Sequence, residues 1–263
     1  MRTRRQRLGQ HFLADPDVAE AIVGVLPPQP PRVLEIGPGQ GALTELLAER
    51  FPRLVAIERD AALAAGLRRR LGHNEGVELI RADARDVPLD RFAGEQPWQV
   101  VGNLPFSVAT PIVRRFLPAH ALASHLVVMV QLEVAGRLAA PPGSGERGLL
   151  SVERELHATC EVLFTVAPRS FRPPPRVVSA VLRLALHPPP VPAALQSRVL
   201  ELASAGFAQR RKKLTNALAR LAPPSIVAAA LDELGADVGA RAQDLNLSTW
   251  CGLAERLPAG GGE

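Results

Sequence analysis

Lysine is almost absent from this sequence of 263 residues. It occurs only at Lys212 and Lys213, so 29 of the 31 basic residues are arginine. Arginine binds phosphate through a planar pair of donors and stacks on bases, so this bias suits a nucleic-acid partner. A GC-rich genome would produce the same bias, and the net charge is only +5. The placement of the arginines along the chain therefore has to decide between the two explanations.

Cysteine and long apolar runs are also scarce. Cys160 and Cys251 lie far apart and form no C-x-x-C pair, so we expect neither a metal site nor a disulfide framework, and a reducing cytoplasm fits best. No segment approaches the roughly 18 consecutive apolar residues of a membrane span, so we expect a soluble protein. The first seven residues hold four arginines without a following apolar core. This pattern favours a basic arm that faces RNA over a secretion signal, with an organellar presequence as the alternative.

Apolar periodicity predicts alternating strands and helices in residues 1–187, the first predicted domain. Residues 1–31 are expected to form the basic arm and a lead-in helix. Alternation of this kind predicts an α/β fold with a doubly wound, mainly parallel, Rossmann-like sheet. The expected strands cover 32–37, 54–59, 77–83, 98–103, 125–131, 159–167 and 177–186, and the expected helices include 42–50, 61–71 and 110–117.

A proline-rich linker at 188–192 separates this domain from a second, all-helical domain at 193–263. Helical spacing is visible at 195–205, 211–221, 225–234 and 249–257. Four basic residues stand together in this domain, and we expect them to bind RNA from a helix: Arg210, Arg211, Lys212 and Lys213. Because consecutive residues point around a helix, only part of the cluster can contact one RNA strand. A solvated helix face is the alternative for each of them.

A glycine-rich loop follows the first predicted strand and precedes a helix, in the segment Glu35-Ile36-Gly37-Pro38-Gly39-Gln40-Gly41. Glycines let a backbone turn tightly and approach a ligand where a Cβ atom would collide. A plain connection between a strand and a helix would not need three glycines at alternate positions. We therefore expect a nucleotide-like cofactor over this loop.

Acidic residues end the next two predicted strands. Glu58 lies 21 residues after Gly37, the interval at which an acid accepts hydrogen bonds from a ribose. Asp83 ends the third strand and could accept from the amine of an adenine. Each acid alone could equally be a solvated strand end. Gly37, Gly39 and Ala42 also satisfy the dinucleotide pattern G-x-G-x-x-A, which leaves an NAD-dependent dehydrogenase as an alternative.

The fourth predicted strand ends in Asn103-Leu104-Pro105-Phe106, which suits methylation of an amine on a planar base. The lone pair of such an amine is delocalised into the ring, and acceptors for both amine hydrogens redirect it toward a methyl carbon. The Asn103 carbonyl and a backbone carbonyl stiffened by Pro105 would supply these acceptors, and Phe106 would stack on the base. The amine loses its proton after attack, so no strong general base is required. A strand-ending turn with a core phenylalanine is the alternative.

The sequence resembles the KsgA-type (RsmA) ribosomal RNA adenine dimethyltransferases over nearly its full length. The resemblance rests on motifs in a fixed order: Gly9-Gln10-His11-Phe12-Leu13, the E-I-G-P-G loop, Glu58, Asp83, N-L-P-F, Gln131-x-Glu133-Val134, Phe171-x-Pro173-Pro174-Pro175-x-Val177 and Phe207-x-Gln209-Arg210-Arg211-Lys212.

The resemblance implies a class I methyltransferase fold with S-adenosyl-L-methionine as donor. It further implies dimethylation of two neighbouring adenines near the 3′ end of small-subunit (16S) rRNA. The small ribosomal subunit would be the partner of a monomeric enzyme that touches no membrane and serves ribosome biogenesis. The implied cofactor-binding residues are His11, Leu13, Gly37, Gly39, Glu58, Asp83 and Asn103, and the implied catalytic residues are Asn103, Leu104, Pro105 and Phe106. Apart from the resemblance, Arg169, Arg172 and Arg176 flank the triple proline, whose stiff backbone could present them to RNA beside the target pocket, and we expect Arg172 to bind RNA there. Prolines that only end one strand before the next are the alternative.

Three residues depart from the family pattern, and two other functions compete with the one that the resemblance implies. Leu132, Arg147 and Thr215 replace residues that are commonly Lys, Tyr and basic, which bears on RNA contacts or packing rather than on methyl transfer. A macrolide-resistance methylase of the large-subunit rRNA is the alternative in the same reaction class. A non-catalytic role in ribosome assembly is a third possibility, which is compatible with catalysis.

Overall fold

The computed structural model describes residues 10–258, which form two compact units. The first unit holds residues 10–135 and 159–187, and the second holds residues 136–158 and 188–258. The arginines of the expected basic arm, at positions 2, 4, 5 and 7, lie outside the described residues.

The first unit is built on a seven-stranded sheet with the strand order β4-β3-β2-β5-β6-β9-β7. Neighbouring strands from β4 to β6 run parallel, and β9 runs antiparallel to β6. The predicted α/β fold with a mainly parallel sheet is therefore confirmed. The strands are β2 (Arg32–Ile36), β3 (Arg53–Glu58), β4 (Val77–Arg81), β5 (Trp98–Asn103), β6 (Ala123–Gln131), β7 (Ala158–Val166) and β9 (Ser179–Leu186).

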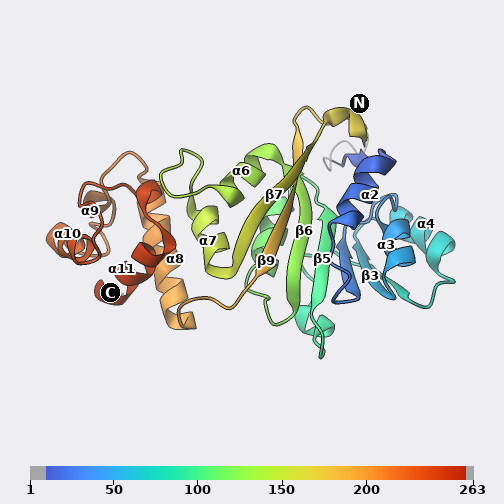
Figure 1. The fold of residues 1–263 in the computed structure, drawn as a ribbon, viewed down its shortest axis with the longest axis horizontal. Coiled ribbons are helices and arrows are strands. Elements are labelled where there is room, and N and C mark those ends of the chain that lie inside the picture. Colours follow the sequence, from blue (N-terminus) through green and yellow to red (C-terminus); the bar gives the residue numbers. More distant parts are fainter. Residues whose placement is uncertain (1–9, 259–263) are drawn as a thin grey trace. The chain divides into compact units, whose positions relative to one another are not determined.

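Helices join the parallel strands, and Figure 1 shows α2, α3 and α4 grouped beside β3. Helix α3 begins two residues later than predicted, because Gly41 has a φ of 92° and the next two residues form a turn. The predicted helix at 61–71 is α4, whose first turn is capped by the Asp60 carboxylate. The helical segments are α2 (Pro16–Gly24), α3 (Thr44–Arg50), α4 (Ala61–Leu71), η1 (Leu89–Phe92), α5 (Ala109–Phe116), α6 (Leu132–Ala139) and η2 (Pro168–Ser170).

The central strands are buried on both faces of the sheet. Every residue of β3 after Arg53 is buried, as is every residue of β5 before Asn103. A parallel strand covered on both faces needs a continuous run of apolar residues instead of an alternating pattern. This requirement explains why the sequence pattern identified these strands so clearly, and it makes the buried Glu35 of β2 an exception.

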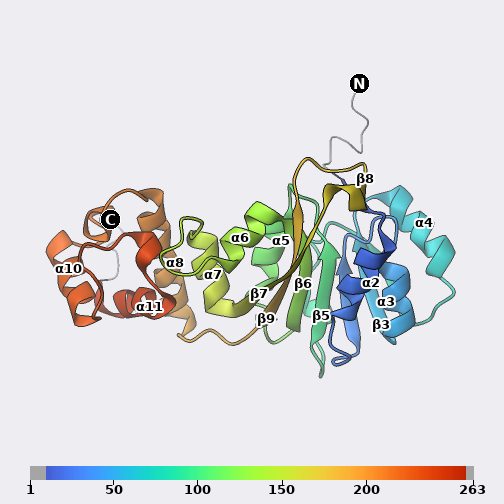
Figure 2. The ribbon, with the colours of Figure 1, turned by 45° about the horizontal axis from the view of Figure 1, so that its top comes forward.

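The direction of strand succession reverses between β2 and β5, which lie side by side in the sheet. The carboxyl ends of parallel strands part at such a switch point and leave room for a ligand. A separate antiparallel pair, β1 (Phe12–Leu13) with β8 (Phe171–Arg172), lies outside the main sheet (Figure 2). The sequence pattern predicted no strand at β1, because two residues carry no periodicity.

The second unit is helical and has its own core. Its helices include α7 (Leu149–His157), which precedes β7 in the chain, and the group α8, α10 and α11 seen together in Figure 2. Trp250 lies fully buried at the centre of this core. The C-terminal segments are α8 (Ala193–Ala208), α9 (Leu214–Ala217), α10 (Pro224–Glu233), η3 (Ala242–Asp244) and α11 (Leu247–Arg256).

Two sequence predictions need correction here. Residues 136–158, which were assigned to the first domain, belong to the helical unit because Val152 and Leu156 of α7 lie in its core. The basic cluster Arg210–Lys213 lies in the turn between α8 and α9 instead of on a helix, and α9 is much shorter than predicted. Helix α8 ends at Ala208, and the four cations follow it in a turn. On a single helical turn their like charges would repel one another. Among the described residues, no helix is long and apolar enough to span a membrane.

Candidate active site at the switch point of the sheet

The glycine loop takes a backbone conformation that requires glycine. Gly37, Gly39 and Gly41 have φ values of 69°, 59° and 92°, in the left-handed region where a side chain is strained. The Gly37 N–H donates to the carbonyl of Ile57 at 2.9 Å, which ties the loop to the end of β3. The loop therefore starts at the carboxyl end of β2 and turns over the neighbouring strand.

Glu58 holds the loop from the end of β3. Its Oε2 accepts the Gly39 N–H at 3.0 Å, and its Oε1 accepts the Asp60 N–H at 2.7 Å. The side chain is 5% exposed, and burial raises its pKa, although the two backbone N–H groups counteract the rise. Each carboxylate oxygen can accept a further hydrogen bond, so Glu58 is a fixed acceptor at the edge of a cavity.

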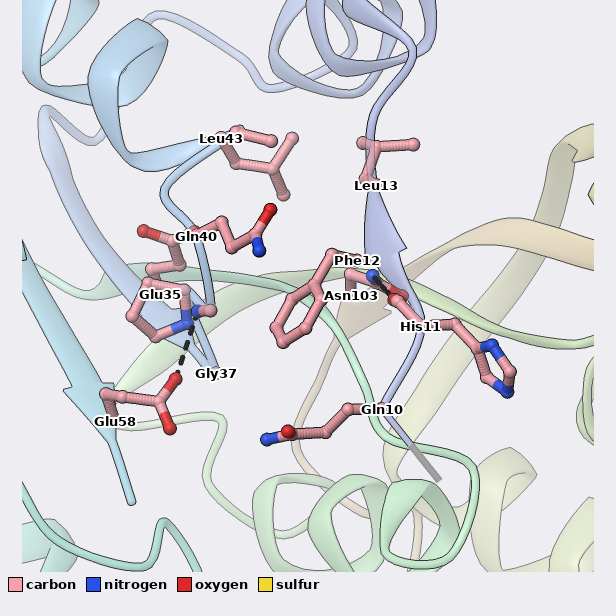
Figure 3. A pocket seen from close by; sticks show the side chains of 13 residues that line it. Gln10, His11, Phe12, Leu13, Glu35, Gly37, Gln40, Leu43, Glu58 and Asn103 are labelled. Carbon is pink, nitrogen blue, oxygen red and sulfur yellow. Dashed lines mark hydrogen bonds between the residues drawn. The ribbon is translucent and has the colours of Figure 1, made fainter. Parts of the chain in front are cut away.

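That cavity has a free volume of about 50 Å³ and lies between the glycine loop and the segment of residues 10–13. The Phe12 ring narrows it, since a Cβ atom on Gly39 would lie 3.1 Å from that ring. In Figure 3, the Phe12 ring and the Gln10 side chain point into the space between Glu58 and Asn103. The Gln10 Oε1 is buried there without a hydrogen-bond partner.

Glu35 also lines this cavity, although the sequence pattern indicated it only as part of the glycine loop. The side chain is 1% exposed, and its Oε2 has no hydrogen-bond partner. Burial raises the pKa of Glu35 to about 8, and the nearby charge of Glu58 adds to the rise. The sequence signal for a special role of Glu35 is its acidic side chain within an otherwise apolar strand. The cavity thus contains two buried oxygen atoms, Gln10 Oε1 and Glu35 Oε2, that lack hydrogen-bond partners.

Asp83 lies just past the end of β4, beside the end of β3, because the Ala82 N–H donates to the carbonyl of Glu58. It does not line the cavity. Its carboxylate accepts two hydrogen bonds from the Arg85 guanidinium, at 3.0 and 2.7 Å, and this partner lowers the pKa of Asp83 to about 2. The structure therefore brings Asp83 to the same edge of the sheet but pairs it with a cation.

The N-L-P-F segment continues directly from β5. The Asn103 Nδ2 donates to the carbonyl of His11 at 3.1 Å, which leaves the Asn103 Oδ1 as the atom that can accept. Leu104 is 1% exposed, so its side chain belongs to the core. The Phe106 ring is half-buried, and its centroid lies 5.4 Å from that of the tilted His11 ring.

A second, larger cavity of about 520 Å³ lies on the other side of His11. The His11 ring points away from the first cavity in Figure 3, and its Nδ1–H donates a hydrogen bond to the Pro173 carbonyl at 2.8 Å. This open cleft, which we call the aromatic cleft, is lined by His11, Phe106, Gln131, Pro173, Pro174, Arg176 and Val177. Asn103 and Phe106, three residues apart, thus face two adjoining cavities.

The expected RNA-binding residues are exposed. Arg172 stands on β8 and donates to the carbonyls of Arg169 and Phe171. In the second unit, Arg210 donates to the carbonyl of Gly145 at 2.7 Å, and the neighbouring Arg211, Lys212 and Lys213 extend the basic turn.

The sheet order, the glycine loop and the acid of the next strand define a class I methyltransferase, whose methyl donor is S-adenosylmethionine. Solved structures support this class. The crystal structure of the 23S rRNA methyltransferase ErmE has a TM-score of 0.72 and 28% identity, and the match covers 94% of this chain and 99% of that one. A dimethyladenosine transferase from Plasmodium falciparum has a TM-score of 0.78 at 20% identity, and the match covers 92% of this chain and 96% of that one. At this identity the likeness supports the fold alone.

The chain belongs to the ribosomal RNA adenine dimethylase family, whose model matches residues 1–258. The ribosomal RNA small subunit methyltransferase A of Synechococcus sp. (strain JA-3-3Ab) is 42% identical over 262 residues, which cover 96% of this chain and 92% of that protein. The protein of the same name from Methylococcus capsulatus is 39% identical over 254 residues, which cover 96% of this chain and 97% of that protein. The predicted family, fold class and cofactor are therefore confirmed, and the chain is an enzyme.

Proposed function

We propose that the enzyme dimethylates the exocyclic amines of two adjacent adenines near the 3′ end of small-subunit rRNA, in the cytoplasm. The observation that carries this proposal is the position of Asn103 and Phe106. Asn103 lines the cavity over the glycine loop, Phe106 lines the aromatic cleft, and His11 borders both. A methyl donor in the first cavity would meet a base in the second beside Asn103.

The residues of the first cavity fit S-adenosylmethionine. The loop has no Cβ atom at Gly37 or Gly39, so its backbone can approach the ligand closely, and Glu58 offers acceptors to a ribose. The unpartnered Gln10 Oε1 and Glu35 Oε2 offer hydrogen-bonding positions to a polar ligand. Pockets for drug-sized ligands span about 300–1,000 Å³, so the Phe12 ring has to turn away from Gly39 when the donor binds.

Asp83 would bind the adenine of the donor from the end of β4. The Asp83 carboxylate already accepts from the side chain and the backbone N–H of Arg85 and lies 3.4 Å from the Arg59 guanidinium, so an adenine amine would have to displace one of these partners. Leu13, which is buried and lines the cavity, would pack against the donor.

Methyl transfer needs the adenine amine to be held and aimed. When bound, S-adenosylmethionine supplies a methyl group on a sulfonium. The Asn103 Oδ1 and the backbone carbonyl of Leu104, held by Pro105, would accept the two amine hydrogens and restore the lone pair on nitrogen. Phe106 would stack on the base in the aromatic cleft. The attacking nitrogen becomes cationic and then releases its proton, which is why the site needs no strong base.

The small subunit is favoured over the large one as the partner. The relatives at about 40% identity that cover nearly the whole chain are named small-subunit enzymes. The large-subunit enzyme ErmE shares the fold at 28% identity. Incubation of purified, unmethylated small and large subunits with labelled S-adenosylmethionine separates the alternatives, and label on the large subunit alone would overturn the proposal.

Replacement of Asn103 by Ala tests the chemistry. Loss of one preorganised hydrogen-bonding group at a reacting centre costs about 10²–10³ in rate, so we expect dimethyladenosine formation to fall by that factor while subunit binding persists. Mass spectrometry of rRNA from cells that lack the enzyme, complemented with wild type or variant, measures the product. The control is Asn216→Ala, an exposed asparagine of α9. Unchanged methylation in the Asn103 variant would remove this residue from the mechanism.

A further inference from the structure

Exposed apolar side chains gather beside the aromatic cleft. Among the described residues, six large apolar side chains are at least 36% exposed: Leu132, Val162, Val177, Val178, Ile226 and Val238. Three of these are neighbours along the backbone, because the Leu132 N–H donates to the Val178 carbonyl at 3.0 Å and Val177 directly precedes Val178. We call Leu132, Val177 and Val178 the apolar rim; they are 45%, 43% and 36% exposed.

The apolar rim is continuous with the aromatic cleft. Val177 belongs to both, and Gln131, which lines the cleft, precedes Leu132 in the chain. Gln131 also pairs with Ser179 across β6 and β9, so this register holds the two sides of the rim together. Isolated exposed apolar residues are normal, whereas a contiguous group beside a binding cleft marks a surface that another molecule covers.

We propose that the apolar rim holds the base of the nucleotide next to the adenine that is being methylated. This inference rests on the proposed function, in which the two target adenines are adjacent. When one base leaves the stack and enters the cleft, its neighbour loses a stacking partner and exposes an apolar face. Leu132, Val177 and Val178 offer a surface for that face, and Arg176 of the cleft stands next to Val177, where it can meet the connecting phosphate.

The aliphatic character of the rim fits a substrate that changes during the reaction. An adenine amine can donate hydrogen bonds, but a dimethylated amine has no hydrogen left to donate. After the first adenine is finished, the strand has to shift so that the second adenine enters the cleft and the dimethylated base occupies the neighbouring position. A polar surface built for an amine would reject the methylated base, whereas an apolar surface accepts both.

The test compares the two dimethylation events in a single reaction. Unmethylated small subunits are treated with wild-type enzyme, Leu132→Ser or the double variant V177S/V178S, and the singly and doubly dimethylated rRNA fragments are followed by mass spectrometry. Serine removes apolar surface that the base, and the dimethylated base above all, would cover. We therefore expect the second dimethylation to slow by about fivefold relative to the first, with an accumulation of singly dimethylated rRNA.

Matched controls separate the rim from general effects. Ile226→Ser removes an apolar side chain of α10 that is 43% exposed, as Val177 is, and should keep the wild-type product ratio. Leu132→Met keeps the apolar surface and should also keep that ratio. Binding of S-adenosylmethionine, measured by calorimetry, should be the same in all variants, because the rim does not line the donor cavity.

The outcomes distinguish the two proposals. If wild-type enzyme forms no dimethyladenosine on small subunits, the proposed function fails. If wild type dimethylates both adenines, and the rim variants give the same ratio of doubly to singly dimethylated rRNA as Ile226→Ser, the proposed function stands and the rim inference is overturned. Equal loss in Leu132→Met and Leu132→Ser would also overturn it. In subunits whose neighbouring nucleotide is abasic, wild type and Leu132→Ser should methylate the remaining adenine at equal rates, and a persisting difference contradicts a contact with the base.

Discussion

Glu35 is the residue whose protonation depends most on its surroundings. Its position within β2 takes the carboxyl group out of water, and the charge of Glu58 further disfavours ionisation. The pKa of about 8 lies above the ordinary value of 4.5. Glu35 therefore stays protonated in the folded protein up to about pH 8, and its contribution to stability is fully present below pH 4.5 and is lost as the pH rises through 8.

Replacement of Glu35 by Gln should flatten the pH dependence of stability. The free energy of unfolding of wild type should fall between pH 5 and pH 8, with a limiting slope of about 1.4 kcal/mol per pH unit. The variant should not show this fall, because its amide stays neutral. Urea unfolding of the donor-free enzyme at pH 5, 6, 7 and 8 measures the free energy of unfolding. Glu49→Gln, at an exposed position of α3, should retain the wild-type slope. Identical slopes in wild type and Glu35→Gln would contradict a buried, protonated Glu35.

Most residues that were predicted for the donor site do gather at one cavity. Gly37 and Gly39 were identifiable because a loop at positive φ needs glycine, and Glu58 because strand ends meet at a switch point. Asp83 reaches the same edge, but the cavity does not extend to it. Its pairing with Arg85 depends on how the chain turns after β4, which no spacing rule specifies.

At the scale of elements, Arg147 shows why one departure from the family pattern concerns packing. Its fully buried guanidinium forms two 2.7 Å hydrogen bonds with Glu155 and donates to the carbonyls of Ala140 and Leu245. These contacts join the start of α7 to its own second turn and to the segment after η3, all within the second unit. A buried cation that satisfies four acceptors fixes the arrangement of the helices around it.

Loss of either partner of this pair should be severe. Arg147→Met leaves the Glu155 carboxylate without its main partner, and Glu155→Gln leaves a buried cation, so each should cost about 3–5 kcal/mol. Thermal melting and amide hydrogen exchange in α7 report the loss. The exposed pair of Arg256 and Glu233, at 3.2 Å in the same unit, is the comparison, and Glu233→Gln should cost less than about 1 kcal/mol. Equal effects at the two pairs would show that burial does not govern the Arg147 pair.

At the scale of the whole molecule, the chain crosses from one unit to the other more than once. Residues 136–158 leave the sheet, contribute to the helical core, and return as β7. The proline-rich segment at 188–192 is therefore not the only passage between the units. Sequence composition identified that passage alone, because the earlier ones lack a change in composition.

A chain that ends after His187 should consequently expose the core face of α7. Val152 and Leu156 are fully buried in a core whose other members come from residues after 188. We expect limited proteolysis to cut this shorter chain within 136–158, and we expect the chain to aggregate. A chain that ends after Pro258 keeps the whole core and should resist cleavage there. Protection of α7 in the shorter chain would contradict the division into these two units.

The amino-acid sequence by itself determined the parallel sheet, because strands buried on both faces need unbroken apolar runs, and it determined the glycine loop, because positive φ values exclude other residues. The motif order also sufficed to identify the family. Only the tertiary structure decided that β1 pairs with β8 across more than 150 residues, that the Glu35 Oε2 is buried without a hydrogen-bond partner beside the cavity over the glycine loop, and that α7 belongs with the C-terminal helices. These features depend on long-range packing, which local patterns of hydrophobicity and spacing do not encode.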